Sequence, residues 1–170
     1  MSKLQMQMES KIGSLYLVCS EQGLHGVFWK KQTVPMLNEK ASVEATWFTK
    51  TLTQLEEYLD GKRKVFELPL CAEGTDFQKK VWHELMKIPY GQTRSYKEIA
   101  VALSDANASR AVGNANGKNP ISIIVPCHRV ISSDGSMGGY AGGLDTKQKL
   151  LSLEELSWQA KFSSISDSLG

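Results

Sequence analysis

The chain has 170 residues, of which 41% are apolar and 22% charged, and its formal net charge is +2. This balance argues against wholesale disorder, and the length suffices for one average domain or two small ones. The sequence has no apolar run near the roughly 18 residues of a membrane-spanning helix, no signal-peptide core and only three cysteines without a CxxC pair, so we expect a soluble cytoplasmic protein (nuclear in a eukaryote) that does not bind membranes.

Residues 1–71 are expected to form a small α/β domain. Two apolar runs, Ile12–Cys19 and Leu24–Trp29, flank a polar turn and predict a β-hairpin. Apolar residues recurring at helical spacing predict a helix over about Ser42–Asp60. Val65–Leu70 is a candidate for a further strand. Strands packed against one helix make a layered α/β domain.

Residues 72–157 are expected to be mostly helical. Thr75 and Ser95 each have Gln or Glu three residues later, the pattern of a capping box at a helix start. Three helices are predicted here: Thr75 to about Ile88, Ser95 to about Leu103, and Ser109 to about Asn116. The second and third of these helices fit either a helix-turn-helix or the commoner plain helical hairpin.

The remaining segments alternate between apolar and polar. Ile121–Val125 is a β-branched run and predicts a strand that ends at Pro126. Gly135–Gly143 is a glycine-rich loop, and a last helix is predicted from Asp145 to about Leu156. Residues 158–170 are mostly polar and are expected to form a frayed tail.

The segment that can carry chemistry is Val125–Val130, with the sequence VPCHRV. A thiolate is strongly nucleophilic, and a nearby imidazole raises its population at neutral pH. Adjacent side chains of a strand point to opposite faces, so contact between Cys127 and His128 would need a kink after Pro126 or a bridging water. A lone cysteine is more often a buried structural residue than a nucleophile, and the Cys-His pair alone does not decide between these two roles.

The whole segment resembles the active-site signature of the O6-alkylguanine-DNA alkyltransferases, and the resemblance extends over roughly Phe77 to Glu154. It implies an α/β (α+β) fold, with a small sheet-plus-helix domain like ribonuclease H before a mostly helical domain that holds the helix-turn-helix and the active-site cysteine. The matching pieces occur in the family's order. They are Ser95-Tyr96, Arg110-Ala111-Val112-Gly113, Asn119-Pro120, the PCHRV core at Pro126–Val130, Gly139-Tyr140-Ala141-Gly142-Gly143 and Glu154.

Members of this family rotate a damaged guanine out of duplex DNA and move its O6 alkyl group to a cysteine that is not regenerated. The resemblance implies a single-turnover repair enzyme for O6-alkylguanine, chiefly O6-methylguanine, that acts as a monomer without a cofactor. Cys127 would accept the alkyl group. His128 would act as its base through a water, and Glu154 would orient the imidazole and help to raise the thiolate population. Tyr96 would supply a proton to the departing base.

The resemblance also implies the DNA contacts and the substrate pocket. Arg110 would fill the stack after the base leaves, on a slim helix that enters the minor groove. Some relatives have Ser where this chain has Ala141, which leaves its tolerance for bulky alkyl groups open. The expected DNA-contacting residues are Arg110, Ala111, Ser95, Lys118 and Arg129. The expected pocket residues are Asn119, Pro126, Val130, Tyr140 and Ala141.

Three other functions compete with this interpretation. A non-catalytic damage-binding protein of the same fold would have replaced the acceptor, whereas Cys127 is present. A papain-like hydrolase would separate its Cys and His by more than a hundred positions and need a third polar partner. A transcriptional regulator would need a further domain.

Some relatives bind a structural zinc, but here only His25 fits such a position well, so we predict no metal.

Overall fold

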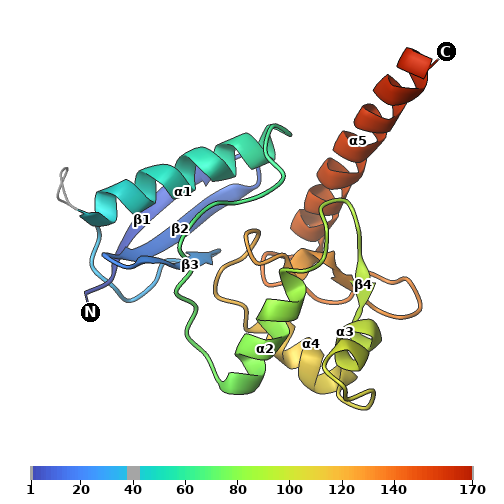
Figure 1. Ribbon diagram of the computed structural model, residues 1–170. Coiled ribbons are helices and arrows are strands. Elements are labelled where there is room, and N and C mark those ends of the chain that lie inside the picture. Colours follow the sequence, from blue (N-terminus) through green and yellow to red (C-terminus); the bar gives the residue numbers. More distant parts are fainter. Residues whose placement is uncertain (1, 38–42, 170) are drawn as a thin grey trace.

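The computed structural model describes residues 2–37 and 43–169, with side chains placed as far as Leu156. Figure 1 shows a sheet covered by one long helix in the N-terminal half, and a group of short helices in the C-terminal half from which the last helix projects. None of the helices in the described ranges is long and apolar enough to cross a bilayer.

The N-terminal half is an antiparallel sheet with the spatial order β1-β2-β3, packed against helix α1. The predicted hairpin is confirmed as β2–β3, with Ser20 opposite Gly23, whereas β1 was not predicted. The helix predicted over Ser42–Asp60 is confirmed as α1, although Ser42 itself lies outside the described residues. The bounds are β1 (Leu4–Ser10), β2 (Gly13–Ser20), β3 (Gly23–Phe28) and α1 (Val43–Leu59).

The outer edge of β3 pairs with two later segments rather than with a fourth strand. The strand predicted at Val65–Leu70 is wrong, because this segment makes only a single bridge, from Leu70 to Leu24. Farther along β3, the amide of Val27 donates to the carbonyl of Pro120 at 2.9 Å, and the amide of Ser122 donates to the carbonyl of Val27 at 3.3 Å. The edge of β3 therefore holds the segment that leads to the PCHRV motif.

Both predicted capping boxes in the C-terminal half are confirmed. The Thr75 and Ser95 hydroxyls each accept a hydrogen bond from the third residue of their helix, whose side chain accepts one in return. The first helix ends earlier than expected, at Leu85, before the turn at residues 89–91. Consecutive helices α3 and α4 pack against each other and against α2. The bounds are α2 (Asp76–Leu85), α3 (Tyr96–Ala102) and α4 (Ser109–Gly117).

The strand predicted at Ile121–Val125 is wrong. Ile123 has φ +73°, in the left-handed region that β-branched residues rarely adopt, and the amide of Val125 folds back to donate to the carbonyl of Ile121 at 3.0 Å. All five side chains are nevertheless buried. The apolar run thus signalled burial, which this segment achieves as a coiled loop rather than as an extended strand.

Three elements follow this loop. A 3-10 turn, η1 (Cys127–Arg129), leads into β5 (Val130–Ile131), which pairs in parallel with β4 (Arg94–Ser95) just before α3. The last helix, α5 (Leu144–Leu169), starts close to the expected residue. Its predicted end near Leu156 is wrong, because the helix continues to Leu169 and projects from the body in Figure 1. The expected fraying of residues 158–170 stays a prediction. The domain limits at 71/72 and 157/158 stay predictions.

Candidate active site

The thiol of Cys127 lies at the start of η1, where the chain turns sharply. Pro126 has φ −82° and ψ 62°, and the amide of Cys127 donates to the carbonyl of Val125 at 2.8 Å. The chain therefore bends at Pro126, which is one of the two arrangements that contact between Cys127 and His128 would need. Burial raises the pKa of the Cys127 thiol to about 11, and a hydrogen bond with Asn119 and the charge of Lys147 offset this only in part.

A cavity of about 200 Å³ opens in front of Cys127. It brings together the predicted catalytic residues Cys127 and Tyr96 with three of the five predicted pocket residues. Pro126 and Val130 are buried in the neighbouring backbone and are not among the lining residues. The lining residues are Tyr96, Gly113, Asn116, Gly117, Asn119, Cys127, Gly139, Tyr140 and Ala141.

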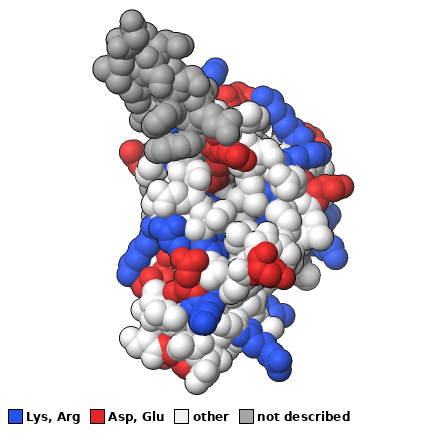
Figure 2. Space-filling model, turned by 90° about the vertical axis from the view of Figure 1, so that its right-hand side faces the viewer, with Lys and Arg blue, Asp and Glu red and all other residues white. Residues whose placement is uncertain are grey.

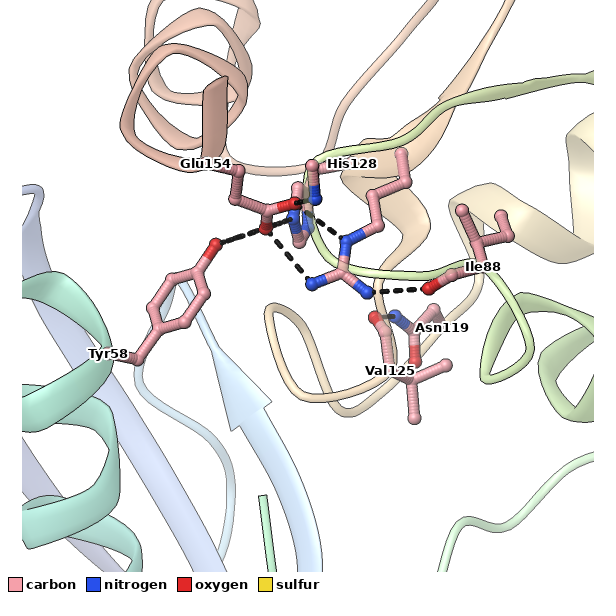
Figure 3. A network of polar contacts seen from close by, with 8 residues as sticks. Tyr58, Ile88, Asn119, Val125, His128 and Glu154 are labelled. Carbon is pink, nitrogen blue, oxygen red and sulfur yellow. Dashed lines mark hydrogen bonds and ion pairs between the residues drawn. The ribbon is translucent and has the colours of Figure 1, made fainter. Parts of the chain in front are cut away.

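His128 and Glu154 form a buried pair behind the thiol. The Nε2 atom of His128 lies 2.7 Å from Oε2 of Glu154, and both side chains are at most 1% exposed (Figure 3). Burial lowers the pKa of His128, although Glu154 acts in the opposite direction. Because Nε2 faces a carboxylate, we assign the proton of the neutral ring to Nε2. Nδ1 then remains a buried acceptor, with no hydrogen-bond partner among the described residues.

The carboxylate of Glu154 is held by donors from several elements. Tyr58 of α1 donates its hydroxyl to Oε2 at 2.5 Å, and the amide of Gly91 donates to Oε1 at 3.1 Å (Figure 3). Arg129 donates Nε to Oε1 at 2.8 Å and Nη2 to Oε2 at 3.1 Å. Burial alone would raise the pKa of Glu154, but the hydrogen bonds and charges of His128 and Arg129 lower it to about 2. The carboxylate is therefore ionised and rigidly placed.

Arg129 does not take the role that the sequence predicted. Its side chain is only 7% exposed, and besides the fork to Glu154 its Nη1 donates to the carbonyl of Ile88 at 2.8 Å. A guanidinium with these partners is not presented to a DNA backbone. We therefore correct the assignment: Arg129 is an internal counter-ion of Glu154 and not a DNA contact.

Asn119 links the end of α4 to the coiled loop before Cys127. Its Nδ2 donates to the carbonyl of Val125 at 2.8 Å (Figure 3). Its Oδ1 accepts from the amide of Ile121 at 3.0 Å. These bonds satisfy buried backbone groups that a regular strand would have paired with a neighbour. The side chain thereby fixes the loop that presents the thiol.

Tyr96 begins α3, and its side chain lines the cavity. Burial raises the pKa of its hydroxyl, which a hydrogen bond with the backbone of Gly139 offsets in part, so the proton is retained at neutral pH. Gly138 has φ +69°, and a Cβ atom there would lie 2.6 Å from the Tyr96 hydroxyl. Only glycine therefore fits at this position of the loop.

Lys147 and Tyr58 were missed by the sequence analysis. The ammonium of Lys147, fully buried in α5, donates to the carbonyls of Val130, Met137 and Gly139, the first at 2.6 Å and the last at 3.2 Å. It ties the glycine-rich loop to the motif and places a positive charge near the thiol. A lysine at the start of a helix carries no signal of such burial. Tyr58 lies on the apolar face of α1, where the sequence pattern indicates only core packing.

The predicted DNA-contacting residues other than Arg129 lie at or near the surface. Arg110, Ala111 and Lys118 are exposed on or just after α4, whereas Ser95 is half-buried and its hydroxyl caps α3. On the face shown in Figure 2, Lys and Arg are interspersed with Asp and Glu. In the described part of the chain, no three His, Cys, Asp or Glu side chains are grouped so that they could hold a metal ion.

Comparisons with known proteins cover both halves of the chain. Residues 5–72 match the family model of the ribonuclease-like domain of 6-O-methylguanine DNA methyltransferase, and residues 76–156 match the model of its DNA binding domain. A methylated-DNA–protein-cysteine methyltransferase of Methanosarcina barkeri is 50% identical, over 86% of this chain and 94% of that protein. A constitutive one of Bacillus subtilis is 41% identical, over 90% of this chain and 96% of that protein.

Solved structures give the same result. The O6-methylguanine methyltransferase of Mycobacterium tuberculosis superimposes with a TM-score of 0.81 at 40% identity, covering 91% of this chain and 94% of that one. A structure of the M. tuberculosis protein in complex with DNA also has a TM-score of 0.81, at 41% identity, covering 92% and 94% of the two chains. The expected two-part fold is confirmed.

Proposed function

The chain belongs to the methylated-DNA–protein-cysteine methyltransferases, which repair DNA by moving an alkyl group to a cysteine of their own, and we propose that Cys127 is the acceptor in this chain. The observation that carries this proposal is that Cys127 lines a cavity and is followed in the sequence by His128, whose Nε2 atom is hydrogen-bonded to Glu154. Cys19 and Cys71 are not among the residues that line this cavity.

The chemistry follows from the protonation states of these groups. We propose that the thiol proton passes through a water to Nδ1 of His128, while Glu154 stabilises the imidazolium that forms. The sulfur then attacks the alkyl carbon, the C–O6 bond breaks, and guanine leaves with the electron pair. Tyr96 donates its proton to the departing base, and the thioether on Cys127 is the end product. Since no step regenerates the thiol, each molecule reacts once.

The DNA-binding role belongs to α4 in this proposal. The helix carries small residues on its surface and the exposed Arg110 in its first turn, which suits insertion into the minor groove and filling of the vacated stack. Flipping a base out of a duplex costs a few kcal/mol, which these contacts and the cavity must offset. That the protein is a monomer and is cytoplasmic stays a prediction.

The proposed proton relay, in which His128 accepts the thiol proton and Glu154 stabilises the imidazolium, is tested by replacing His128 and Glu154 separately. His128→Ala and Glu154→Gln should each slow methyl transfer from an O6-methylguanine duplex by about 10²-fold or more, the typical contribution of a positioned general base. Glu155→Gln, at the exposed neighbouring position of α5, is the matched control and should transfer at the wild-type rate. Single-turnover quench measurements give the rates. A relay variant that reacts as fast as the control would remove that residue from the mechanism.

A further inference from the structure

Trp29, from the N-terminal half of the chain, reaches the active-site segment directly. It follows β3, whose edge pairs with residues 120–122, and its indole Nε1 donates to the hydroxyl of Ser122 at 3.1 Å. Ser122 is 2% exposed and lies in the coiled loop before Cys127. The indole is thus anchored to the same loop that presents the acceptor thiol.

The same indole packs against the glycine-rich loop. Its ring centroid lies 5.7 Å from that of Tyr140, with an interplanar angle of 69°, the edge-to-face arrangement that aromatic pairs favour. A Cβ atom added to Gly142 would lie 2.6 Å from the indole. Because Gly142 has no side chain, the indole can pack directly on the backbone of the loop at this residue, which follows Tyr140 and Ala141 in the sequence.

Packing against Trp29 positions Tyr140, which is one of the residues that line the cavity. Its ring is a neighbour of both Trp29 and His128, and the centroid of the His128 ring is 6.5 Å away at an interplanar angle of 84°. Its buried hydroxyl has no hydrogen-bond partner in the described part of the chain. The ring is consequently held by packing alone, and the Trp29 indole is one of its two aromatic neighbours.

We propose that Trp29 is a positioning residue that sets the size of the alkyl pocket, by holding Tyr140 and the loop at Gly142 against Cys127. The proposal rests on the proposed function, because the cavity must receive an alkylated base. Without the indole, Tyr140 and the loop gain room to move outward. A methyl carbon is then held less well against the sulfur, while a bulky group gains space.

The test compares two alkyl groups in one DNA context. Transfer rates are measured for O6-methylguanine and O6-benzylguanine placed in the same duplex, so that DNA binding and flipping contribute equally to both. Trp29→Ala should raise the ratio of the benzyl rate to the methyl rate by about tenfold. Trp29→Phe, which keeps an aromatic ring but loses the bond to Ser122, should shift this ratio in the same direction by less.

Trp47→Ala is the matched control for loss of an indole from the same half of the protein. Trp47 lies on α1, its Nε1 donates to the carbonyl of Glu21 at 2.9 Å, and it does not line the cavity. The rate ratio should be unchanged in this variant. Any general destabilisation of the N-terminal half should then affect Trp47→Ala and Trp29→Ala alike, without changing the preference between alkyl groups.

A reciprocal variant tests the contact from the side of the loop. Gly142→Ala should slow methyl transfer because its methyl group meets the indole, and the same change should cost little in a Trp29→Ala background. The inference is overturned if Trp29→Ala and Trp29→Phe change both rates by one common factor, or if the two sites act additively. Wild-type protein that transfers neither group would instead refute the proposed function itself.

Discussion

The thiol of Cys127, which we propose as the acceptor, is held in its protonated form. Burial raises its pKa to about 11, so the thiolate is a minor species at neutral pH in the absence of DNA. We expected His128 and Glu154 to raise the thiolate population, but the side chains that lower the pKa of this thiol are Asn119 and Lys147, and burial outweighs both. Burial likewise lowers the pKa of His128, which leaves the ring neutral and able to accept a proton. The relay therefore acts during the reaction rather than before it.

Because the raised pKa keeps Cys127 protonated, the rate at which it is alkylated should depend on pH. Alkylation of Cys127 by iodoacetamide, without DNA, should speed up by about tenfold per pH unit through the neutral range, because only the thiolate reacts and its fraction rises with pH until the pKa is reached. Peptide mass spectrometry after timed quenching gives the rate at Cys127. A rate that levels off near neutral pH would show a thiolate already formed in the resting protein.

In the proposed function, helix α4 carries the contacts that distinguish duplex DNA from a free base. Arg110→Ala should slow repair of an O6-methylguanine duplex far more than reaction with free O6-benzylguanine, which requires no flipping. Lys118→Ala provides the comparison, because a phosphate contact should weaken DNA binding and lower the salt slope by about 0.9 without affecting the free base. Equal losses on both substrates would mean that Arg110 supports the fold or the pocket, and the assignment would be withdrawn.

Elements with local signals could be predicted from the sequence, and elements fixed by distant contacts could not. The capping boxes at Thr75 and Ser95 specify helix starts through hydrogen bonds within four residues, so α2 and α3 were found. The composition of Ile121–Val125 predicts burial but does not distinguish a strand from an irregular loop. The loop conformation depends on hydrogen bonds with Asn119 and with the edge of β3. Local periodicity contains neither contact.

The same distinction applies to the site. Cys127, His128 and Glu154 were identified through a family resemblance, and the structure brings the latter two into contact. Arg129 was predicted to contact DNA, but it is buried beside a carboxylate that lies 25 residues away in the sequence. Tyr58 lies 96 residues from Glu154 in the sequence, so nothing local could indicate their hydrogen bond.

The two halves of the molecule are joined through Glu154, and the stability of the whole should depend on its charge. Its pKa is about 2 in the folded protein against an ordinary value of 4.5, so the unfolded chain takes up a proton first as the pH falls. The stability it contributes, about 3 kcal/mol, is present above about pH 4.5 and is lost progressively toward about pH 2. Acidification should therefore weaken the contact between α1 and α5.

Urea unfolding of wild-type protein and Glu154→Gln tests this sign. The wild-type protein should be more stable near neutral pH, and the difference between the two should shrink as the pH is lowered below about 4.5. Glu155→Gln should follow the wild-type curve throughout. A difference between wild type and Glu154→Gln that stays constant down to about pH 3 would contradict the depressed pKa of Glu154.

The most direct test of the account is the intact mass of the protein after incubation with an excess of duplex DNA that contains O6-methylguanine. The account predicts that every active molecule gains one methyl group and no more, that the group maps to Cys127, and that Cys127→Ser binds the same DNA without any gain in mass. Repeated turnover by one molecule, a methyl group on Cys19 or Cys71, or unchanged mass despite DNA binding would contradict it.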